Sequence, residues 1–202
     1  YTPAIAEKTV EKILQSKKTT LCTLCERRIS YKHKQFETLL IAEPYLLLKH
    51  NPFLSEHDRF YQDPMVNSLF TKMCHTVWGK NPKEFLVREV LRCHFGAEDV
   101  SNPAWIENCK THIEADISQY KLKGIVLFGK AARILFPDNK VRSKYVGKVF
   151  SFCGLPTVLS PGADTIIDLQ NAKAPPEKIK QVKKLAFDAM KLFEKEVMHA
   201  QQ

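Results

Sequence analysis

The chain has 202 residues, 44% of them hydrophobic, which is enough apolar material for one domain with a sizeable core. No apolar run reaches the roughly 18 residues that a membrane-spanning helix needs. The amino-terminal stretch has no signal-peptide core, so we expect an intracellular, cytoplasmic protein without a membrane partner. The formal net charge of +9 is expected to attract phosphate polyanions, which makes nucleic acid a candidate partner.

Hydrophobic periodicity predicts helices and strands that alternate along the chain. The first elements are a helix at residues 4–17 and a buried strand at 36–42 that ends before Pro44, followed by a long loop at 45–63. The later elements are predicted as a helix at 64–77, a strand at 85–91, a helix at 103–120, a strand at 124–128, a short helix at 130–136, a strand at 150–159 and a final helix at about 176–198. Such alternation predicts one α/β domain over residues 1–202, with a four-stranded, mainly parallel sheet flanked by helices.

The predicted sheet has three loops that leave the carboxyl ends of strands, at residues 43–45, 129–130 and 160–162. In open parallel sheets, ligands bind beyond the carboxyl ends of the strands. These loops are therefore the expected site for a ligand, whatever the family of the protein.

Four cysteines have spacings typical of a metal site. Cys22 and Cys25 form a C-x-x-C pair, and Cys93 and Cys109 follow from the middle of the chain, sixteen residues apart. Four thiolates suit a tetrahedral zinc ion or a 4Fe–4S cluster. In a reducing compartment, metal binding is favoured over disulfides, although ordinary buried or surface thiols remain the alternative.

The cysteine spacing resembles that of the iron–sulfur branch of the uracil-DNA glycosylase superfamily. The segments ENCKTHIEADI at 107–117 and GIVLFGKAARIL at 124–135 share this resemblance, which covers roughly residues 18–190. It implies a structural 4Fe–4S cluster held by Cys22, Cys25, Cys93 and Cys109, with zinc as the alternative metal. It also implies that double- or single-stranded DNA binds in a cleft at the strand ends.

The catalytic motifs of that superfamily match this chain in part. The first motif is G-E-A-P-G in the iron–sulfur branch and G-Q-D-P-Y-H in the best-known branch, and the corresponding stretch here is IAEPYL at residues 41–46. Anchored on Pro44, the resemblance places Glu43 where an aspartate activates water. It places Tyr45 where a tyrosine excludes a 5-methyl group. The last motif, H-P-S, corresponds to S-P-G at 160–162, so Ser160 replaces a histidine.

Two further positions concern a flipped base. Phe60 or Tyr61 could stack on it, and Glu89 stands where an asparagine reads the uracil edge. An ionised carboxylate only accepts hydrogen bonds, so Glu89 would suit an amino group, as on cytosine- or adenine-like edges. The resemblance thus implies a DNA repair hydrolase that cleaves the N-glycosidic bond of a damaged or modified base, without the ordinary preference for uracil.

Two alternatives stay open. The missing histidine and asparagine fit a glycosylase-fold protein that binds nucleic acid or a partner without catalysis. In either case the expected DNA contacts are Lys130, Arg142, Lys144 and Lys148. The second alternative is an unrelated α/β protein with a structural zinc. We expect a monomer throughout.

The candidate carboxylates also have purely structural interpretations. Glu43 would then be a loop carboxylate bound to backbone, and Glu89 would pair with Arg88 or Arg92 at a strand end.

Overall fold

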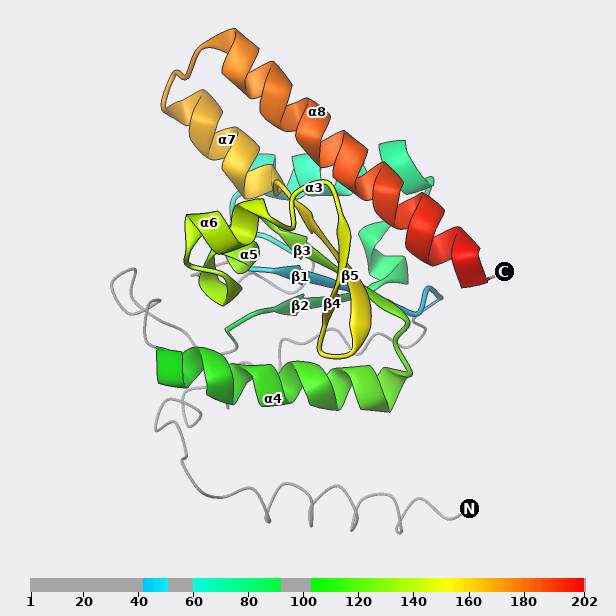
Figure 1. The fold of residues 1–202 in the computed structure, drawn as a ribbon. Coiled ribbons are helices and arrows are strands. Elements are labelled where there is room, and N and C mark those ends of the chain that lie inside the picture. Colours follow the sequence, from blue (N-terminus) through cyan, green and yellow to red (C-terminus); the bar gives the residue numbers. More distant parts are fainter. Residues whose placement is uncertain (1–41, 51–59, 92–102, 202) are drawn as a thin grey trace, which may run out of the picture.

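The computed structural model describes residues 42–50, 60–91 and 103–201. The helix predicted at 4–17 lies outside these residues, and so does the strand predicted at 36–42 apart from Ala42, which belongs to no strand. The described part is an α/β structure with a five-stranded sheet between two layers of helices (Figure 1). None of its helices is both long and apolar enough to cross a membrane.

The strands pair in the order β2-β1-β3-β5-β4. Four of them are parallel, and β4 runs antiparallel to β5 at one edge. Their bounds are β1 Tyr45–Lys49, β2 Leu86–Glu89, β3 Gly124–Phe128, β4 Val149–Phe152 and β5 Leu155–Ser160. The predicted α/β class with a mainly parallel sheet is therefore confirmed.

The described sheet has one strand more than expected, because the strand predicted at 150–159 is a hairpin. Cys153 and Gly154 form the two-residue turn between β4 and β5, and both have positive φ angles, 49° and 77°. Two positive φ angles are the signature of a type I′ hairpin turn, which reverses the chain while keeping the strand twist.

The predicted bounds of the helices lie close to those in the structure. They are α3 Pro64–Trp78, α4 Pro103–Tyr120, α5 Gly129–Leu135 and α8 Pro176–Phe193, and α8 continues into a π-helical turn, η3, at Glu194–Met198. The short helices α6 (Asn139–Ser143) and α7 (Ala163–Asn171) were not predicted. Two 3-10 turns, η2 at Pro82–Glu84 and η4 at His199–Gln201, complete the described elements.

The prediction of a loop over residues 45–63 is wrong at residues 45–49, which form β1; residues 60–63 belong to no helix or strand, and 51–59 lie outside the described residues. All five residues of β1 are buried, and a strand covered on both faces has a continuous apolar run rather than an alternating pattern. Local pattern alone does not show that the apolar run after Pro44 enters the sheet.

Successive residues of each central strand face opposite layers. Leu47, Val126 and Val158 belong to one apolar cluster with α3, α7 and α8, whereas Leu46 and Ile125 belong to a second cluster with α4 and α5. Figure 1 shows α4 on one side of the sheet and α7 and α8 on the other. Burial on both faces is what confines a ligand to the strand ends.

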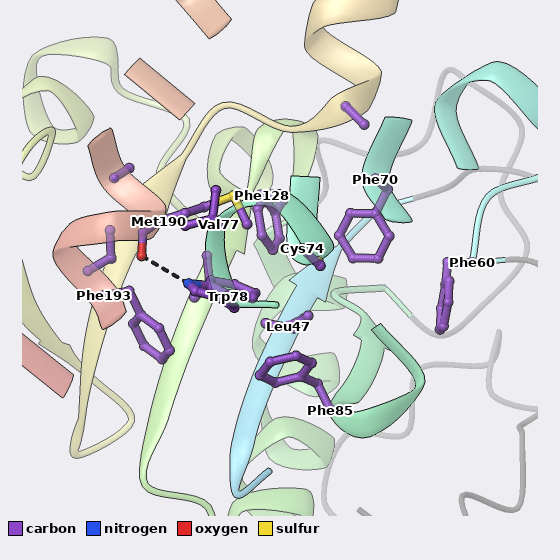
Figure 2. Packing of buried hydrophobic residues seen from close by; sticks show 14 of the residues in the cluster. Leu47, Phe60, Phe70, Cys74, Val77, Trp78, Phe85, Phe128, Met190 and Phe193 are labelled. Atoms are coloured by element: carbon purple, nitrogen blue, oxygen red, sulfur yellow. Dashed lines mark hydrogen bonds between the residues drawn. The ribbon is translucent and has the colours of Figure 1, made fainter. Parts of the chain in front are cut away.

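Aromatic side chains fix α3 and α8 onto the first face (Figure 2). The Trp78 Nε1 atom donates a hydrogen bond to the carbonyl oxygen of Met190 at 3.1 Å, which ties α3 to α8. Phe70 of α3 meets Phe128 of β3 edge to face, with ring centroids 5.5 Å apart. The first contact fixes the end of α3 to α8, and the second places the middle of α3 beside the carboxyl end of β3.

Candidate functional site at the carboxyl edge of the sheet

Four parallel strands end at one edge of the sheet, which we call the carboxyl edge. Lys49 ends β1, Glu89 ends β2, Phe128 ends β3 and Ser160 ends β5. The chain passes from β1 outward to β2 and then returns to place β3 on the other side of β1. Such a reversal of strand order is where ligands bind in open α/β sheets, so the ends of β1 and β3 are the first place to look.

Lys49 and Glu89 form a buried ion pair at this edge. The two residues are register partners on β1 and β2, and the Lys49 Nζ atom contacts the Glu89 Oε1 atom. The same ammonium lies 4.6 Å from the centre of the Tyr61 ring, in a cation–π contact. Glu89 thus pairs with Lys49, and the Arg88 Nε atom lies 3.4 Å from Asp116 Oδ2. Arg92, the other predicted partner of Glu89, lies outside the described residues.

His50 and Tyr61 bring polar atoms without partners into the same place. His50 is 5% exposed and Tyr61 is 3% exposed, yet neither imidazole nitrogen nor the phenol oxygen has a hydrogen-bond partner within the described ranges. Leaving a buried polar group unsatisfied costs about 1–3 kcal/mol. Groups of this kind, gathered at a strand-order reversal, mark a place where a polar ligand would be stabilising.

Burial and the neighbouring charges also set the charge states of His50 and Tyr61. Burial lowers the pKa of His50 to about 4, with help from the positive charges of Lys49 and Lys130, so the imidazole is neutral at physiological pH. Burial raises the pKa of Tyr61 well above its ordinary value, and the nearby carboxylates of Asp164 and Glu89 add to this. Both side chains are thus neutral donors and acceptors.

Asp164, at the start of α7, joins the loops that follow β3 and β5. Its carboxylate accepts hydrogen bonds from the backbone nitrogens of Lys130, at 3.2 Å, and Thr165, at 2.8 Å. A Cβ atom at Gly129 or at Gly162 would collide with this carboxylate. The two glycines therefore allow the carboxylate to approach both loops closely.

The predicted base-stacking aromatics are part of the core. The rings of Phe60 and Tyr61 both meet Phe70 edge to face, with centroids 5.7 and 5.4 Å apart, and Asn67 Oδ1 accepts hydrogen bonds from both of their backbone nitrogens. Ser160 lies at the carboxyl edge as expected. It is buried, and its hydroxyl donates to the Pro161 carbonyl at 3.1 Å.

Glu43 and Tyr45 lie at the opposite, amino edge. The prediction that residues 43–45 leave the carboxyl end of a strand is wrong, because they precede and begin β1. Glu43 pairs with Lys80 at 2.7 Å, and the Tyr45 hydroxyl donates to the Met198 carbonyl at 3.4 Å. A five-residue strand is about 16 Å long, so Glu43 and Ser160 are not brought together.

The four predicted DNA-contacting side chains fall into two groups. Lys130 pairs with Asp168 at 3.1 Å, and Arg142 donates to the Pro137 carbonyl and to Asn139 Oδ1, at 3.3 and 2.9 Å. These two are engaged within the protein. Lys144 and Lys148, beside them along the chain, are exposed, and their side chains make no ion pair among the residues that the structure describes.

The predicted metal ligands are described only at Cys109; Cys22, Cys25 and Cys93 lie outside the described ranges. Cys109 is buried on the sheet side of α4, in the apolar cluster that also contains Leu91, two residues before Cys93 in the sequence. This placement fits a ligand set built from the β2 end and α4. Among the described residues, no group of three or more His, Cys, Asp or Glu side chains could hold a metal ion.

Sequence reasoning missed Lys49 and His50 because it did not predict the strand at Tyr45–Lys49, and it missed Asp164 because it did not predict α7. The usable signal was the polar pair Lys49-His50, which follows an uninterrupted run of leucines just before Asn51 and Pro52. A run ended by polar residues and proline is typical of a buried strand that leads into a ligand loop.

The chain was also compared with known proteins. No family model matches it, and neither does any curated protein.

Proposed function

We propose that the protein is a uracil-DNA glycosylase-like DNA repair enzyme that hydrolyses the N-glycosidic bond of a damaged or modified base at the carboxyl edge. One observation carries this proposal: His50 and Tyr61 are buried beside the Lys49–Glu89 pair, and their polar side-chain atoms have no hydrogen-bond partner among the residues that the structure describes. The net charge of +9, the exposed Lys144 and Lys148 and the spacing of the four cysteines support a DNA substrate and a 4Fe–4S cluster.

His50 is the group best suited to stabilise the departing base. Base release leaves negative charge on the base, and a fixed donor in a water-poor site lowers the energy of that charge. A neutral imidazole donates one N–H and keeps the other nitrogen as an acceptor. Because the pKa of His50 is about 4, this donor stays neutral at physiological pH.

The new position of β1 also changes where the first motif of the superfamily falls. Anchored on Pro52 instead of Pro44, the pattern G-Q-D-P-Y-H places Asn51 at the water-activating position and Phe53 at the tyrosine position. Both residues lie outside the described ranges. An amide can orient a water molecule but cannot take its proton, so this alignment predicts slow hydrolysis.

A base-release assay tests the proposal on duplexes and single strands that carry defined lesions, with enzyme in excess. His50→Ala should slow base release by about 100-fold, the size expected for one lost oxyanion-type donor. Glu43→Ala is the matched control at the amino edge and should leave the rate unchanged. Base release that depends on Glu43, or no release from any lesion, would contradict the proposal.

A non-catalytic DNA-binding protein is the second candidate function. It is favoured by the engagement of both carboxylates described at the carboxyl edge, since Glu89 pairs with Lys49 and Asp164 accepts backbone hydrogen bonds. In that case DNA binding should be salt-sensitive and should survive His50→Ala, with no base released.

A further inference from the structure

The Lys49 amine has an environment suited to covalent chemistry. Its Nζ atom is in contact with the Glu89 carboxylate and lies over the Tyr61 ring, and both charged side chains are buried. The Glu89 carboxylate is therefore placed to accept a proton directly from the Lys49 ammonium. A buried lysine with its own proton acceptor is the arrangement that Schiff-base enzymes use.

Lys49 and Lys130 both lie at the carboxyl edge, but their surroundings differ. Lys130 is more than a third exposed, and its carboxylate partner, Asp168, is exposed as well. Water solvates both charges of that pair. Lys49, in contrast, ends the strand at which the strand order reverses and adjoins the unpartnered His50.

We propose that Lys49 is a nucleophile that forms a Schiff base with an aldehyde, the C1′ carbon of the ring-opened deoxyribose at an abasic site. This inference rests on the proposed function, because release of a base from DNA leaves that sugar. The protein would then cleave the DNA strand as well as release the base.

The step balances within the Lys49–Glu89 pair. Glu89 takes a proton from the Lys49 ammonium, and the free amine adds to C1′, so that a C–N bond forms and the carbonyl becomes a hydroxyl. Glu89 returns its proton to that hydroxyl, which leaves as water, and the product is a protonated imine beside a carboxylate. Charge is conserved, and no oxidant or metal is needed.

Strand cleavage follows from the imine. The positively charged C=N bond acidifies the C2′ hydrogen, and the Glu89 carboxylate accepts that proton. The electron pair of the C2′–H bond forms a C2′=C3′ double bond, and the 3′ phosphate leaves with the electrons of its C–O bond. Hydrolysis of the imine then restores the Lys49 amine.

Borohydride trapping tests the proposal without requiring base release. The probe is a duplex that already contains one abasic site, mixed with the full chain and sodium borohydride, which reduces an imine to a stable amine. We expect a covalent protein–DNA adduct whose label maps to Lys49 by mass spectrometry. Lys49→Arg should abolish the adduct, whereas Lys80→Arg, in the lysine–glutamate pair at the amino edge, should leave it unchanged.

Three outcomes would overturn the role of Lys49: no adduct in the wild-type chain, an adduct that persists in Lys49→Arg, or a label on an exposed lysine such as Lys130. Mapping of the wild-type adduct needs no variant, so a folding defect in Lys49→Arg cannot obscure the result. Base release without an adduct rejects only the Schiff base. An adduct on abasic DNA without release of any base rejects the proposed hydrolysis instead.

Discussion

Lys49 and Glu89 are 40 residues apart in the sequence but are direct register partners at the ends of β1 and β2, where they form a buried ion pair. Parallel pairing places the two side chains on the same face of the sheet, next to Tyr61. The pair fixes the relative position of the two strand ends that border the candidate site.

Replacing one member of the Lys49–Glu89 pair should lower the free energy of unfolding more than replacing both members. Glu89→Met leaves the buried Lys49 ammonium without its carboxylate partner, and Lys49→Met takes that ammonium away from the buried Glu89 carboxylate, so each should lower the free energy of unfolding by about 3–5 kcal/mol. The double variant should be more stable than either single one, because no charge remains to be desolvated. Urea denaturation of the four proteins gives the coupling energy, and additive losses would contradict a coupled pair.

His50 should make the protein less stable in acid. Its pKa is about 4 when folded, against an ordinary 6.5, so between these values the unfolded chain binds a proton that the folded chain does not. Stability is therefore lost as pH falls from 6.5 to 4, at about 1.4 kcal/mol per pH unit, or about 3 kcal/mol in all. Melting curves of His50→Gln, recorded between pH 6.5 and pH 4, should not show this loss of stability.

The control for that measurement is His199, an exposed histidine at the carboxyl-terminal end of the described chain. His199→Gln should keep the acid dependence of the wild-type protein. An equal slope in His50→Gln and the wild type would show that His50 is not buried in its neutral form.

The close approach of Asp164 to two glycines predicts that alanine substitutions at different glycines lower the stability by different amounts. Gly162 has an ordinary negative φ, so Gly162→Ala adds no backbone strain but brings a collision with Asp164 and a tight contact with the Gly129 backbone, at about 1–3 kcal/mol. Gly129→Ala should cost more, because φ is +45° and the collision is also present. Gly147→Ala has a positive φ and open space, so it isolates the backbone strain at about 1–2 kcal/mol.

Thermal unfolding ranks the three variants. A cost at Gly162 no greater than that of a surface substitution would mean that the Asp164 carboxylate moves aside freely.

The exposed lysines should account for salt-dependent DNA binding. Lys144→Ala and Lys148→Ala should each weaken binding to every sequence and reduce the slope of log K against log salt by about 1. Arg142→Ala should instead lower the melting temperature, because its guanidinium holds the segment around α6 through Pro137 and Asn139. Unchanged slopes in both lysine variants would place the DNA elsewhere.

The four-cysteine site predicts a coloured protein. Anaerobically purified chain should absorb near about 400 nm if a 4Fe–4S cluster is bound, and Cys109→Ser should remove that absorption. Cys153→Ser is the matched control, since Cys153 is a turn residue between β4 and β5. A colourless protein that contains zinc would support the structural-zinc alternative.

The amino-acid sequence by itself determined the α/β alternation and the bounds of α3, α4 and β3, because helical periodicity, prolines at helix starts and β-branched runs act within a few residues. It did not determine that the apolar run after Pro44 forms β1, since that depends on neighbours supplied by β2 and β3. Only the tertiary structure decided that Glu43 lies at one edge and His50 at the other. It also decided that Lys49 meets Glu89 and that Asp164 lies between two loops. Those contacts join residues far apart in the chain, and burial among them gives each group its charge state.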